Sequence, residues 1–516
     1  PGHIYPWIPR IGLNAGRRRR STDMSEKLNP PMQTGDSLDL VIDGYSNEGD
    51  GVGHVDRFAV FVPGALTGEE VAVCVEHVKG SYARARLERV LRTSPDRVDP
   101  ACSLYGECGG CQLLHMSYSA QLEMKRRRVV DALERIGKLD DVTVHPVIGM
   151  DEPWRYRNKA QYAVGIRDGE VVAGYLAHGT HRIVPADDCA IQSGLNCRVA
   201  SSVRRLAATF GLSIYDERSM AGFLKNIIVK NAFGTGQVMV VLTTTGARFP
   251  GGRARSREFG ERIADQFPEV KSVVQVVMDA AGDMHHVARA AGRRGRTPMG
   301  SDRFEGNTIT LWGEPAIVDV LDGLKFRISA ISFYQVNPSQ AVTLYRKAVE
   351  YAGLTGRERV LDAYSGVGTV SLFMARAARE VYGIESVRSA VHDARANAEL
   401  NAITNARFIE GRVERVLPAL LHDGITFDVA VMDPPRAGCD REALLALAGE
   451  VTESDGTRVL GGVPRIVYIS CNPSTLARDL AILSGLGYRS IEVQPVDMFP
   501  HTHHVETVVL MSRVKE

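Results

Sequence analysis

One cysteine and one carboxylate near the C-terminus have the residue types for covalent chemistry. Cys471 follows the apolar run at 466–469, and Glu506 opens another apolar run further along the chain. A cysteine thiolate is a strong nucleophile, and a nearby carboxylate can remove a proton. The pair therefore suits a reaction in which the thiolate adds to an electron-poor ring and later leaves it. A lone cysteine after a strand is more often a buried small hydrophobe, so its surroundings decide.

A glycine turn about a hundred residues upstream suits a nucleotide-like cofactor. Residues 360–369 read as a strand, a turn containing Gly366 and Gly368, and the start of a helix. Such a turn lets the backbone approach a ligand closely. The next strand, 380–384, ends at Glu385, an acid placed to accept hydrogen bonds from ribose hydroxyls. Because the third glycine of the dinucleotide fingerprint is missing, the pattern favours S-adenosylmethionine over NAD.

A third strand, 427–432, delivers the sequence Asp-Pro-Pro-Arg at 433–436 to the edge where open α/β sheets hold their ligands. Asp-Pro-Pro also occurs in adenine N-methyltransferases, but an aromatic residue follows it there, and here Arg436 follows. Cytosine methyltransferases carry their cysteine beside this loop or in a Pro-Cys element. Cys471 instead lies after the next strand and is followed by Asn-Pro.

Four motifs, in order, resemble those of the RNA 5-methyluridine methyltransferases, and the resemblance covers nearly the whole chain from about Gln33. They occupy residues 333–338, 433–438, 470–473 and 499–506. The resemblance implies that Cys471 is the nucleophile and Glu506 the base. It places the cofactor contacts at Gln335, Tyr364, Thr369, Glu385, Asp433 and Arg412. At the last position the family usually has a short polar or acidic residue, so this chain departs from the pattern there.

The chemistry of uracil agrees with these residue types. Carbon 5 of uracil is a poor nucleophile until a thiolate adds to carbon 6, and a base must then remove the carbon 5 proton so that the thiolate can leave. The target base must be unstacked or flipped, which favours loops of a folded RNA. Two rivals stay open: a cytosine-5 RNA methyltransferase with the same thiolate chemistry, and a non-enzymatic RNA-binding iron-sulfur protein.

Clustered cysteines give a second signal. Cys102, Cys108 and Cys111 lie close together in a chain with only eight cysteines, a pattern more typical of metal binding than of a disulfide scaffold. By the resemblance, Cys189 completes a [4Fe-4S] cluster, and soft thiolates suit such a cluster. Zinc is the alternative. With every iron held by protein ligands, the cluster is expected to be structural or to face the RNA.

Composition frames these sites within an ordinary globular enzyme. Hydrophobic residues make up 44% and charged residues 24%, and the net charge is +1. No apolar run approaches the length of a membrane span. We expect a cytoplasmic, monomeric protein whose partner is RNA. Large-subunit (23S) ribosomal RNA is favoured and transfer RNA is the alternative, because the resembling branch with both barrel and cluster acts on ribosomal RNA.

The predicted fold is α/β in four parts. These are a disordered leader or misassigned start (1–32), a small antiparallel, OB-like TRAM barrel that binds RNA (33–93), a central β-rich iron-sulfur domain (94–318) and a Rossmann-like class I methyltransferase domain (319–516). A helix is expected at 119–137. Residues 154–159 interleave aromatic and cationic side chains that could contact RNA. Segments 280–306 and 451–464 look like insertions, the second a surface loop.

Overall fold

The computed structural model describes residues 30–278, 308–453, 456–459 and 461–514. The chain divides into two compact units, one of residues up to 44 and 51–93, the other of residues 45–50 and all those from 94 onward. The expected leader up to residue 29 and the expected insertion at 280–306 lie outside the described residues. No helix in the described ranges is both long and apolar enough to cross a membrane.

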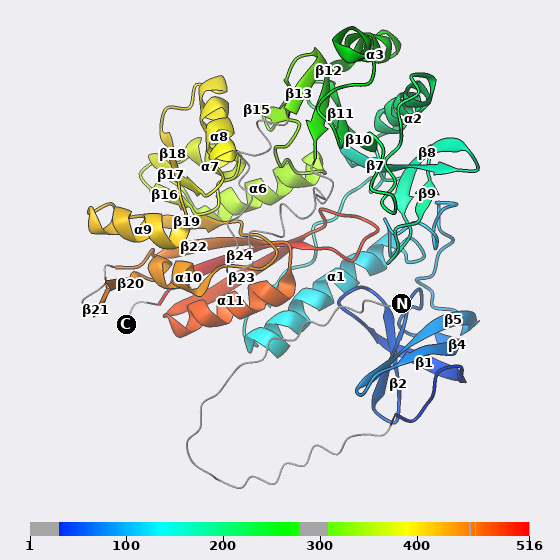
Figure 1. Cartoon of the computed structure of the whole chain (residues 1–516). Coiled ribbons are helices and arrows are strands. Elements are labelled where there is room, and N and C mark those ends of the chain that lie inside the picture. Colours follow the sequence, from blue (N-terminus) through cyan, green and yellow to red (C-terminus); the bar gives the residue numbers. More distant parts are fainter. Residues whose placement is uncertain (1–29, 279–307, 454–455, 460, 515–516) are drawn as a thin grey trace. The chain divides into compact units, whose positions relative to one another are not determined.

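The first unit is built around a closed five-stranded barrel in the order β1-β2-β3-β5-β4, drawn in blue in Figure 1. Its strands are β1 (Ser37–Tyr45), β2 (Gly51–Val55), β3 (Phe58–Val62), β4 (Glu70–Val78) and β5 (Tyr82–Arg92). Alternate side chains such as Val71, Val73 and Val75 fill its interior, as a strand's two-residue period requires. The barrel was predicted to be antiparallel; one correction is that β3 pairs with β5 in parallel.

A seven-stranded sheet forms the centre of the second unit, in the order β13-β12-β11-β10-β7-β8-β9 (Figure 1). Its strands are β7 (Lys159–Arg167), β8 (Glu170–Leu176), β9 (Ile183–Pro185), β10 (Leu224–Asn231), β11 (Val238–Thr244), β12 (Val270–Val277) and β13 (Thr308–Gly313). Helices α2 (Gly194–Thr209) and α3 (Gly252–Gln266) cover one face. The hairpin of β14 (Ala316–Leu321) and β15 (Leu324–Ser329) packs on the other.

The C-terminal part contains an eight-stranded sheet in the order β18-β17-β16-β19-β22-β24-β23-β6. Its strands are β6 (Thr143–Val144), β16 (Arg359–Asp362), β17 (Glu380–Glu385), β18 (Ala406–Glu410), β19 (Val429–Met432), β22 (Arg465–Ser470), β23 (Tyr488–Val496) and β24 (Glu506–Arg513). Strands β16 to β19 and β22 are parallel, and β24 runs antiparallel between β22 and β23. The short strand β6 comes from far upstream and extends the sheet beside β23.

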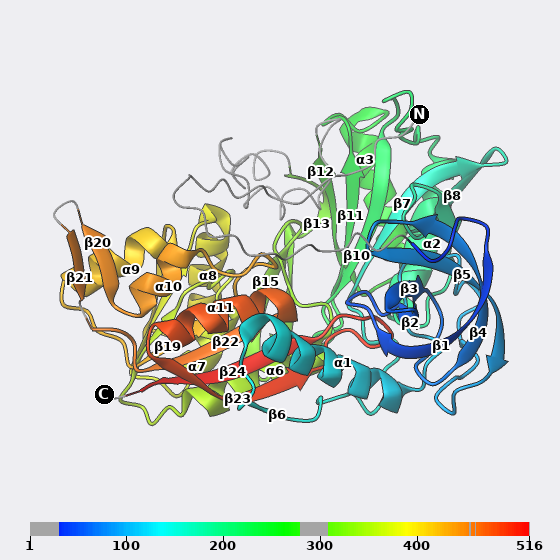
Figure 2. The ribbon, with the colours of Figure 1, turned by 90° about the horizontal axis from the view of Figure 1, so that it is seen from below.

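Helices cover both faces of this sheet, as expected for a doubly wound α/β fold (Figure 2). One face packs against α6 (Pro338–Ala352), α7 (Thr369–Ala375) and α8 (Arg388–Leu400), and the other against α1 (Tyr118–Ala132), α9 (Val413–His422), α10 (Arg441–Leu447) and α11 (Pro473–Gly485). Neighbours on one strand, such as Ile466 and Val467, enter opposite cores. Near-continuous apolar strands are typical of sheets buried on both faces.

Two expectations about local structure need adjustment. The predicted surface loop at 451–464 contains a hairpin of β20 (Glu450–Glu453) and β21 (Gly456–Val459). The predicted helix at 119–137 is present, but it ends as α1 at Ala132 and continues as a π-helical turn, η1 (Leu133–Gly137). Lys138 then adopts a left-handed conformation and ends the segment.

A buried ion pair ties α1 to the strand end that leads toward Glu506. Lys125 Nζ lies 2.6 Å from Asp497 Oδ1, and both side chains are fully buried. Lys125 also donates to the backbone oxygen of Phe499, and the Tyr118 hydroxyl donates to the second carboxylate oxygen of Asp497. Since these contacts join residues over 370 positions apart, they fix the path of the segment before β24.

We expect Lys125→Met to lower the free energy of unfolding by about 3–5 kcal/mol, because it leaves the Asp497 carboxylate buried without its cation. Chemical denaturation measures this loss. The double variant Lys125→Met/Asp497→Asn should recover part of it, since no lone charge is left inside. If Lys125→Met were as stable as the wild type, the ion pair would not contribute to the stability of the fold.

Candidate active site

The two residues predicted to do the chemistry meet at one edge of the eight-stranded sheet. The parallel strands β16, β17, β19 and β22 all end at this edge. Strand β24 runs the opposite way and begins there, with Thr507 paired to Ser470. The residue after Ser470 is Cys471, and the residue before Thr507 is Glu506. Neighbouring strands therefore place the thiol and the carboxylate side by side.

The surroundings of the Cys471 thiol disfavour its ionised form. Burial, followed by the Glu506 carboxylate, raises the pKa of this half-buried thiol to about 12, and Asp433 acts in the same direction. Arg436 is the cation that opposes them. In the absence of a bound ring, the cysteine is thus held protonated, and Arg436 is the group that favours the thiolate.

The neighbouring carboxyl groups hold protons more tightly than usual. Glu506 is buried, and burial together with the nearby Asp433 raises its pKa well above the usual value, with Arg436 opposing the shift. Burial raises the pKa of Asp433 to about 7, and Asp362 contributes. Groups that exchange a proton near neutral pH are suited to acid–base catalysis.

The turn after β16 forms a polar cradle. The Ser371 hydroxyl donates to Asp362 Oδ2 at 2.6 Å, while the buried Oδ1 atom of Asp362 has no hydrogen-bond partner. Burial raises the pKa of Asp362 to about 6. Gly368, the residue immediately before α7, has φ +85°, and a Cβ there would lie 3.0 Å from the Phe408 ring. An L side chain is strained there, so glycine keeps the backbone open to a ligand.

Glu385 lies at the end of β17 and holds this turn from the other side. One carboxylate oxygen accepts a hydrogen bond from the backbone amide of Gly366 at 3.1 Å, and the other accepts one from Val387 at 2.7 Å. Thr369, the first residue of α7, is half-buried beside the same turn. Both predicted residues are thus at the glycine turn.

Tyr345 is a residue of this site that the sequence interpretation missed. Its buried hydroxyl lies within hydrogen-bonding reach of Gln335, and the nearby Asp433 and Glu506 carboxylates help burial to raise its pKa. Gln335 is further anchored through its backbone oxygen, which accepts from Asn158 Nδ2 at 3.0 Å. A tyrosine on the inner face of α6 looks like a core residue in the sequence, so its spacing carries no signal.

Two predicted cofactor positions turn toward α9. Burial raises the pKa of the Tyr364 hydroxyl, which lies against Cys439 and also faces Glu414. Arg412 is 53% exposed, and its guanidinium lies 3.2 Å from the Glu414 carboxylate. Two acids face Tyr364 on this side, Asp440 and Glu414. Glu414 lies two residues after the position at which the family's short polar residue was expected.

The loop containing Arg436 is bound to the start of α11, which follows Cys471. The backbone oxygen of Arg436 accepts from Asn472 Nδ2 and from the Thr475 hydroxyl, both at 3.2 Å. The buried Asp479 accepts from the backbone amide of Cys439 and from the Tyr468 hydroxyl, each at 2.7 Å. These bonds fix the arginine loop relative to the cysteine.

The four predicted metal ligands lie near one another in the second unit. Burial raises the pKa of Cys111 to about 12, and Cys189, Cys108 and Cys102 all contribute to the shift. The amide of Gly110 donates to Cys108 Sγ at 3.4 Å. Among the described residues, no three His, Cys, Asp or Glu side chains have a ready metal-binding arrangement.

The cysteine segment is connected to the segment before Glu506. The backbone amides of Gln112 and Leu113 both donate to the backbone oxygen of His501 at 3.1 Å. His501 has a left-handed backbone (φ +66°) and stacks on Trp154 at 4.0 Å between ring centroids. Within the predicted RNA-binding stretch at 154–159, Tyr156 and Asn158 are buried, Arg155 is exposed and the other three residues are half-buried.

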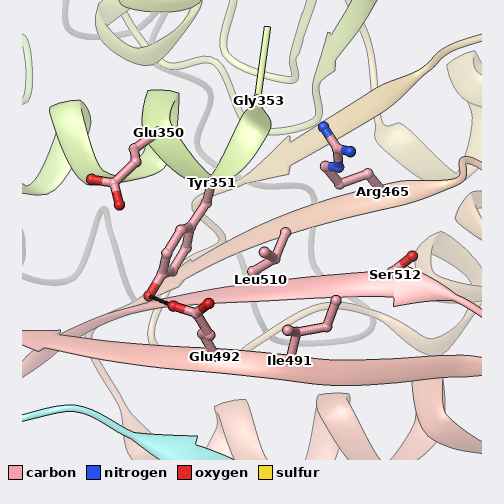
Figure 3. A pocket seen from close by; sticks show the side chains of 8 residues that line it. All are labelled: Glu350, Tyr351, Gly353, Arg465, Ile491, Glu492, Leu510 and Ser512. Carbon is pink, nitrogen blue, oxygen red and sulfur yellow. Dashed lines mark hydrogen bonds between the residues drawn. The ribbon is translucent and has the colours of Figure 1, made fainter.

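A hollow of about 370 Å³ lies at the opposite edge of the eight-stranded sheet (Figure 3). Tyr351 points to Glu492 there and donates a hydrogen bond at 3.3 Å, while Arg465 marks the beginning of β22. Cys471 follows the other end of that strand. The hollow is therefore separate from the candidate chemistry.

Known proteins similar in sequence or fold cover most of this chain. The tRNA (uracil-5-)-methyltransferase family matches residues 319–514, and the TRAM domain matches residues 31–87. An uncharacterized RNA methyltransferase of Halalkalibacterium halodurans is 44% identical, covering 94% of this chain and 99% of the relative. Another uncharacterized RNA methyltransferase, from Caldanaerobacter subterraneus, is 42% identical, and the match covers 94% of this chain and 99% of the relative.

Among solved structures, the tRNA (uracil-54, C5)-methyltransferase of Pyrococcus abyssi, in complex with S-adenosyl-L-homocysteine, is similar with a TM-score of 0.68. It is 28% identical, and the match covers 92% of this chain and all of that one. The similarity thus extends over the barrel, the central sheet and the eight-stranded sheet.

Proposed function

This chain belongs to the RNA methyltransferase family of the uracil-5 type, and we propose that it transfers a methyl group from S-adenosylmethionine to carbon 5 of a uridine in structured RNA. The observation that carries the proposal is the meeting of Cys471 and Glu506 at the sheet edge that also holds Asp433 and Glu385. The same edge of the sheet has residues that fit a nucleoside, which supports S-adenosylmethionine as the methyl donor.

The residues at the glycine turn fit S-adenosylmethionine, which would supply the methyl group. Glu385 follows the second strand of the sheet, where an acid binds ribose hydroxyls. The unpartnered Asp362 Oδ1 can accept a hydrogen bond from a ligand. Gln335, Tyr364, Thr369 and Asp433 are the other proposed contacts. For the adenine side we propose Glu414 in place of Arg412, because the Glu414 side chain is only 19% exposed whereas that of Arg412 is 53% exposed.

In the proposed mechanism the Cys471 thiol gives up its proton to solvent, its sulfur forms a bond to carbon 6 of the uracil, and the ring becomes an enolate. Carbon 5 then takes the methyl group from S-adenosylmethionine, whose bond between that methyl group and sulfur breaks, so that it leaves as S-adenosylhomocysteine. Glu506 removes the carbon 5 proton, the electron pair re-forms the ring double bond, and the sulfur–carbon bond breaks. Arg436, which favours the thiolate, assists the first step. The raised proton affinity of Glu506 suits the last step.

We expect Glu385→Ala to weaken S-adenosylmethionine binding by about 1–3 kcal/mol, the typical effect of losing a charge-assisted hydrogen bond in a partly buried site. Titration calorimetry measures it. Glu410→Ala is the matched control, since Glu410 ends the adjacent strand β18 and is exposed. Equal affinities for the two variants would place the ribose away from Glu385.

Large-subunit ribosomal RNA is the proposed substrate, supported by the combination of a TRAM barrel with the cysteine group. Transfer RNA is the second candidate, because the similar Pyrococcus abyssi enzyme acts on tRNA uracil 54. Mapping 5-methyluridine in separated ribosomal and transfer RNA, with and without the protein, tests both. If the RNA made without the protein lacked a 5-methylcytidine but no 5-methyluridine, the result would favour a cytosine-5 enzyme and contradict the proposal.

We also propose that Cys102, Cys108, Cys111 and Cys189 hold a [4Fe-4S] cluster. The effect of the other three cysteines on the pKa of Cys111 supports this, because it shows that the four sulfur atoms lie close together. A bound metal ion would deprotonate such thiols. The amide that donates to Cys108 Sγ is a contact that also stabilises cluster sulfurs. The backbone amides of Gln112 and Leu113, just after Cys111, donate hydrogen bonds to His501. We therefore infer that the cluster supports the segment before Glu506.

Protein purified without oxygen should contain about four irons per chain, and Cys108→Ser should lose iron together with thermal stability. Iron analysis and thermal unfolding measure the two effects. Cys74→Ser in the barrel is the control and should keep its iron. Stoichiometric zinc without iron would assign the four thiols to a zinc site.

A further inference from the structure

A group of nitrogen-rich side chains lies beside the catalytic edge and takes no part in the reaction described above. Arg128 comes from α1, while His503 and His504 precede β24. The Arg128 guanidinium donates through Nη1 to the backbone oxygen of His503. The two imidazole rings lie 4.2 Å apart between centroids. This group, here called the Arg128 cluster, is therefore fixed to the segment that leads into Glu506.

Two polar atoms of the Arg128 cluster are buried and have no hydrogen-bond partner. They are Nε of Arg128 and Nδ1 of His503. Buried polar atoms nearly always have a partner, so exceptions point to a ligand, an ion or a water. The Arg128 Nε atom can only donate. The group that would satisfy it must therefore be an acceptor.

The charges around the cluster favour an anionic acceptor. Burial, with Arg128 and Arg436 beside the rings, lowers the pKa of His503 to about 4 and that of His504 to about 3. The uncharged imidazoles thus lie next to permanent guanidinium charges. Glu48 is the carboxylate that faces Arg128.

Two further basic groups face the cluster. Lys125 faces both imidazoles, but its ammonium is already paired with Asp497. His178 faces His503. Because Lys125 is paired with Asp497, the guanidinium groups of Arg128 and Arg436 are the main charges that face both imidazoles. An unpartnered donor such as Arg128 Nε beside guanidinium charges is suited to phosphate oxygens.

We propose that Arg128, His503 and His504 form a subsite for one backbone phosphate of the RNA, next to the uridine that reaches Cys471. This inference rests on the proposed function. Arg436 faces both the Cys471 thiol and the two imidazoles, which places the subsite beside the reacting base. Phosphate contacts set register and orientation, and a flipped nucleotide needs its backbone held.

The test measures the affinity of a fluorescent uridine dodecamer by anisotropy over a range of salt concentrations. For Arg128→Gln we expect weaker binding and a log–log salt slope smaller by about 0.7, the value for one lost phosphate contact on a single strand. Arg127→Gln is the matched control, because Arg127 is exposed on the same helix and paired with Asp131. Its slope should equal that of the wild type.

His503→Phe provides a second variant that keeps a ring but removes Nδ1, and it should also weaken RNA binding. If a thermal melt shows that Arg128→Gln does not fold, the RNA affinity of His503→Phe tests the proposal instead. Calorimetry with S-adenosylmethionine should show unchanged affinity for both variants. Weaker cofactor binding with unchanged RNA binding would assign the anion to the cofactor's carboxylate and overturn the proposal. Wild-type RNA affinity in both Arg128→Gln and His503→Phe would overturn it as well.

Cys471→Ala separates this inference from the proposed function. That protein should bind the dodecamer with the wild-type salt slope, because the subsite does not use the thiol. If no RNA were methylated by the wild-type protein, a reduced slope in Arg128→Gln would still support the phosphate subsite.

Discussion

Cys471→Ala is expected to abolish methyl transfer, with a loss of rate of at least about a thousandfold, because the proposed mechanism requires the Cys471 thiolate to add to carbon 6. Transfer of a labelled methyl group to RNA measures the rate. Binding of S-adenosylmethionine should stay close to that of the wild type, since the thiol lies at the end of β22 and the proposed ribose contact at the end of β17.

Cys74→Ala serves as the control for this variant. Cys74 lies on β4 of the barrel, so its loss should leave the rate unchanged. Activity of Cys471→Ala within tenfold of the wild type would show that Cys471 is not the nucleophile. Loss of cofactor binding in the same variant would show instead that the substitution damages the sheet edge as a whole.

The meeting of the candidate catalytic residues could be predicted in part from the sequence, because the positions of strand ends in a sheet follow simple rules. Parallel strands bring their carboxyl ends to one edge, so Glu385, Asp433 and Cys471 were expected together. Glu506 opens a strand, and only the antiparallel placement of β24 brings it to that edge. The resemblance supplied this step, since the local pattern of a strand does not specify its direction.

Residues that act from helices were harder to predict. Tyr345 faces the candidate site from the inner side of α6, where an aromatic residue looks like part of the core. Lys125 lies in a run of basic residues on α1 that suggests a solvent-exposed surface, yet it is fully buried against Asp497. Contacts between residues hundreds of positions apart have no local signature, so such partners become visible only in the fold.

The partner of Arg412 and the pairing of β6 were also not evident from the local sequence. A single arginine in place of a short polar residue suggests an altered cofactor contact, but the structure pairs it with Glu414 two residues later. Strand β6 is two residues long and joins the sheet through β23. Its pairing depends on the position of α1, and a two-residue strand has too short a pattern to recognise.

Glu506→Gln is expected to methylate its substrate once and then to stay joined to it. The amide cannot remove the carbon 5 proton, so the ring cannot re-form its double bond and expel the Cys471 sulfur. Gln has nearly the same size, and burial beside Asp433 already disfavours the charged form of Glu506, so the neutral amide should not unfold the protein. Denaturing electrophoresis with labelled RNA should show a covalent band.

RNA that carries 5-fluorouridine tests the same step in the wild-type protein. Fluorine at carbon 5 cannot leave as a proton does, so the methylated ring should remain bound to Cys471. The double variant Cys471→Ala/Glu506→Gln is the matched control and should give no band with either RNA. If Glu506 only stabilised the fold, its variant would lose stability and rate together and accumulate no adduct. Absence of a band from both Glu506→Gln and the fluorinated RNA, with active wild-type protein, would refute the proposed division of work between the thiol and the carboxylate.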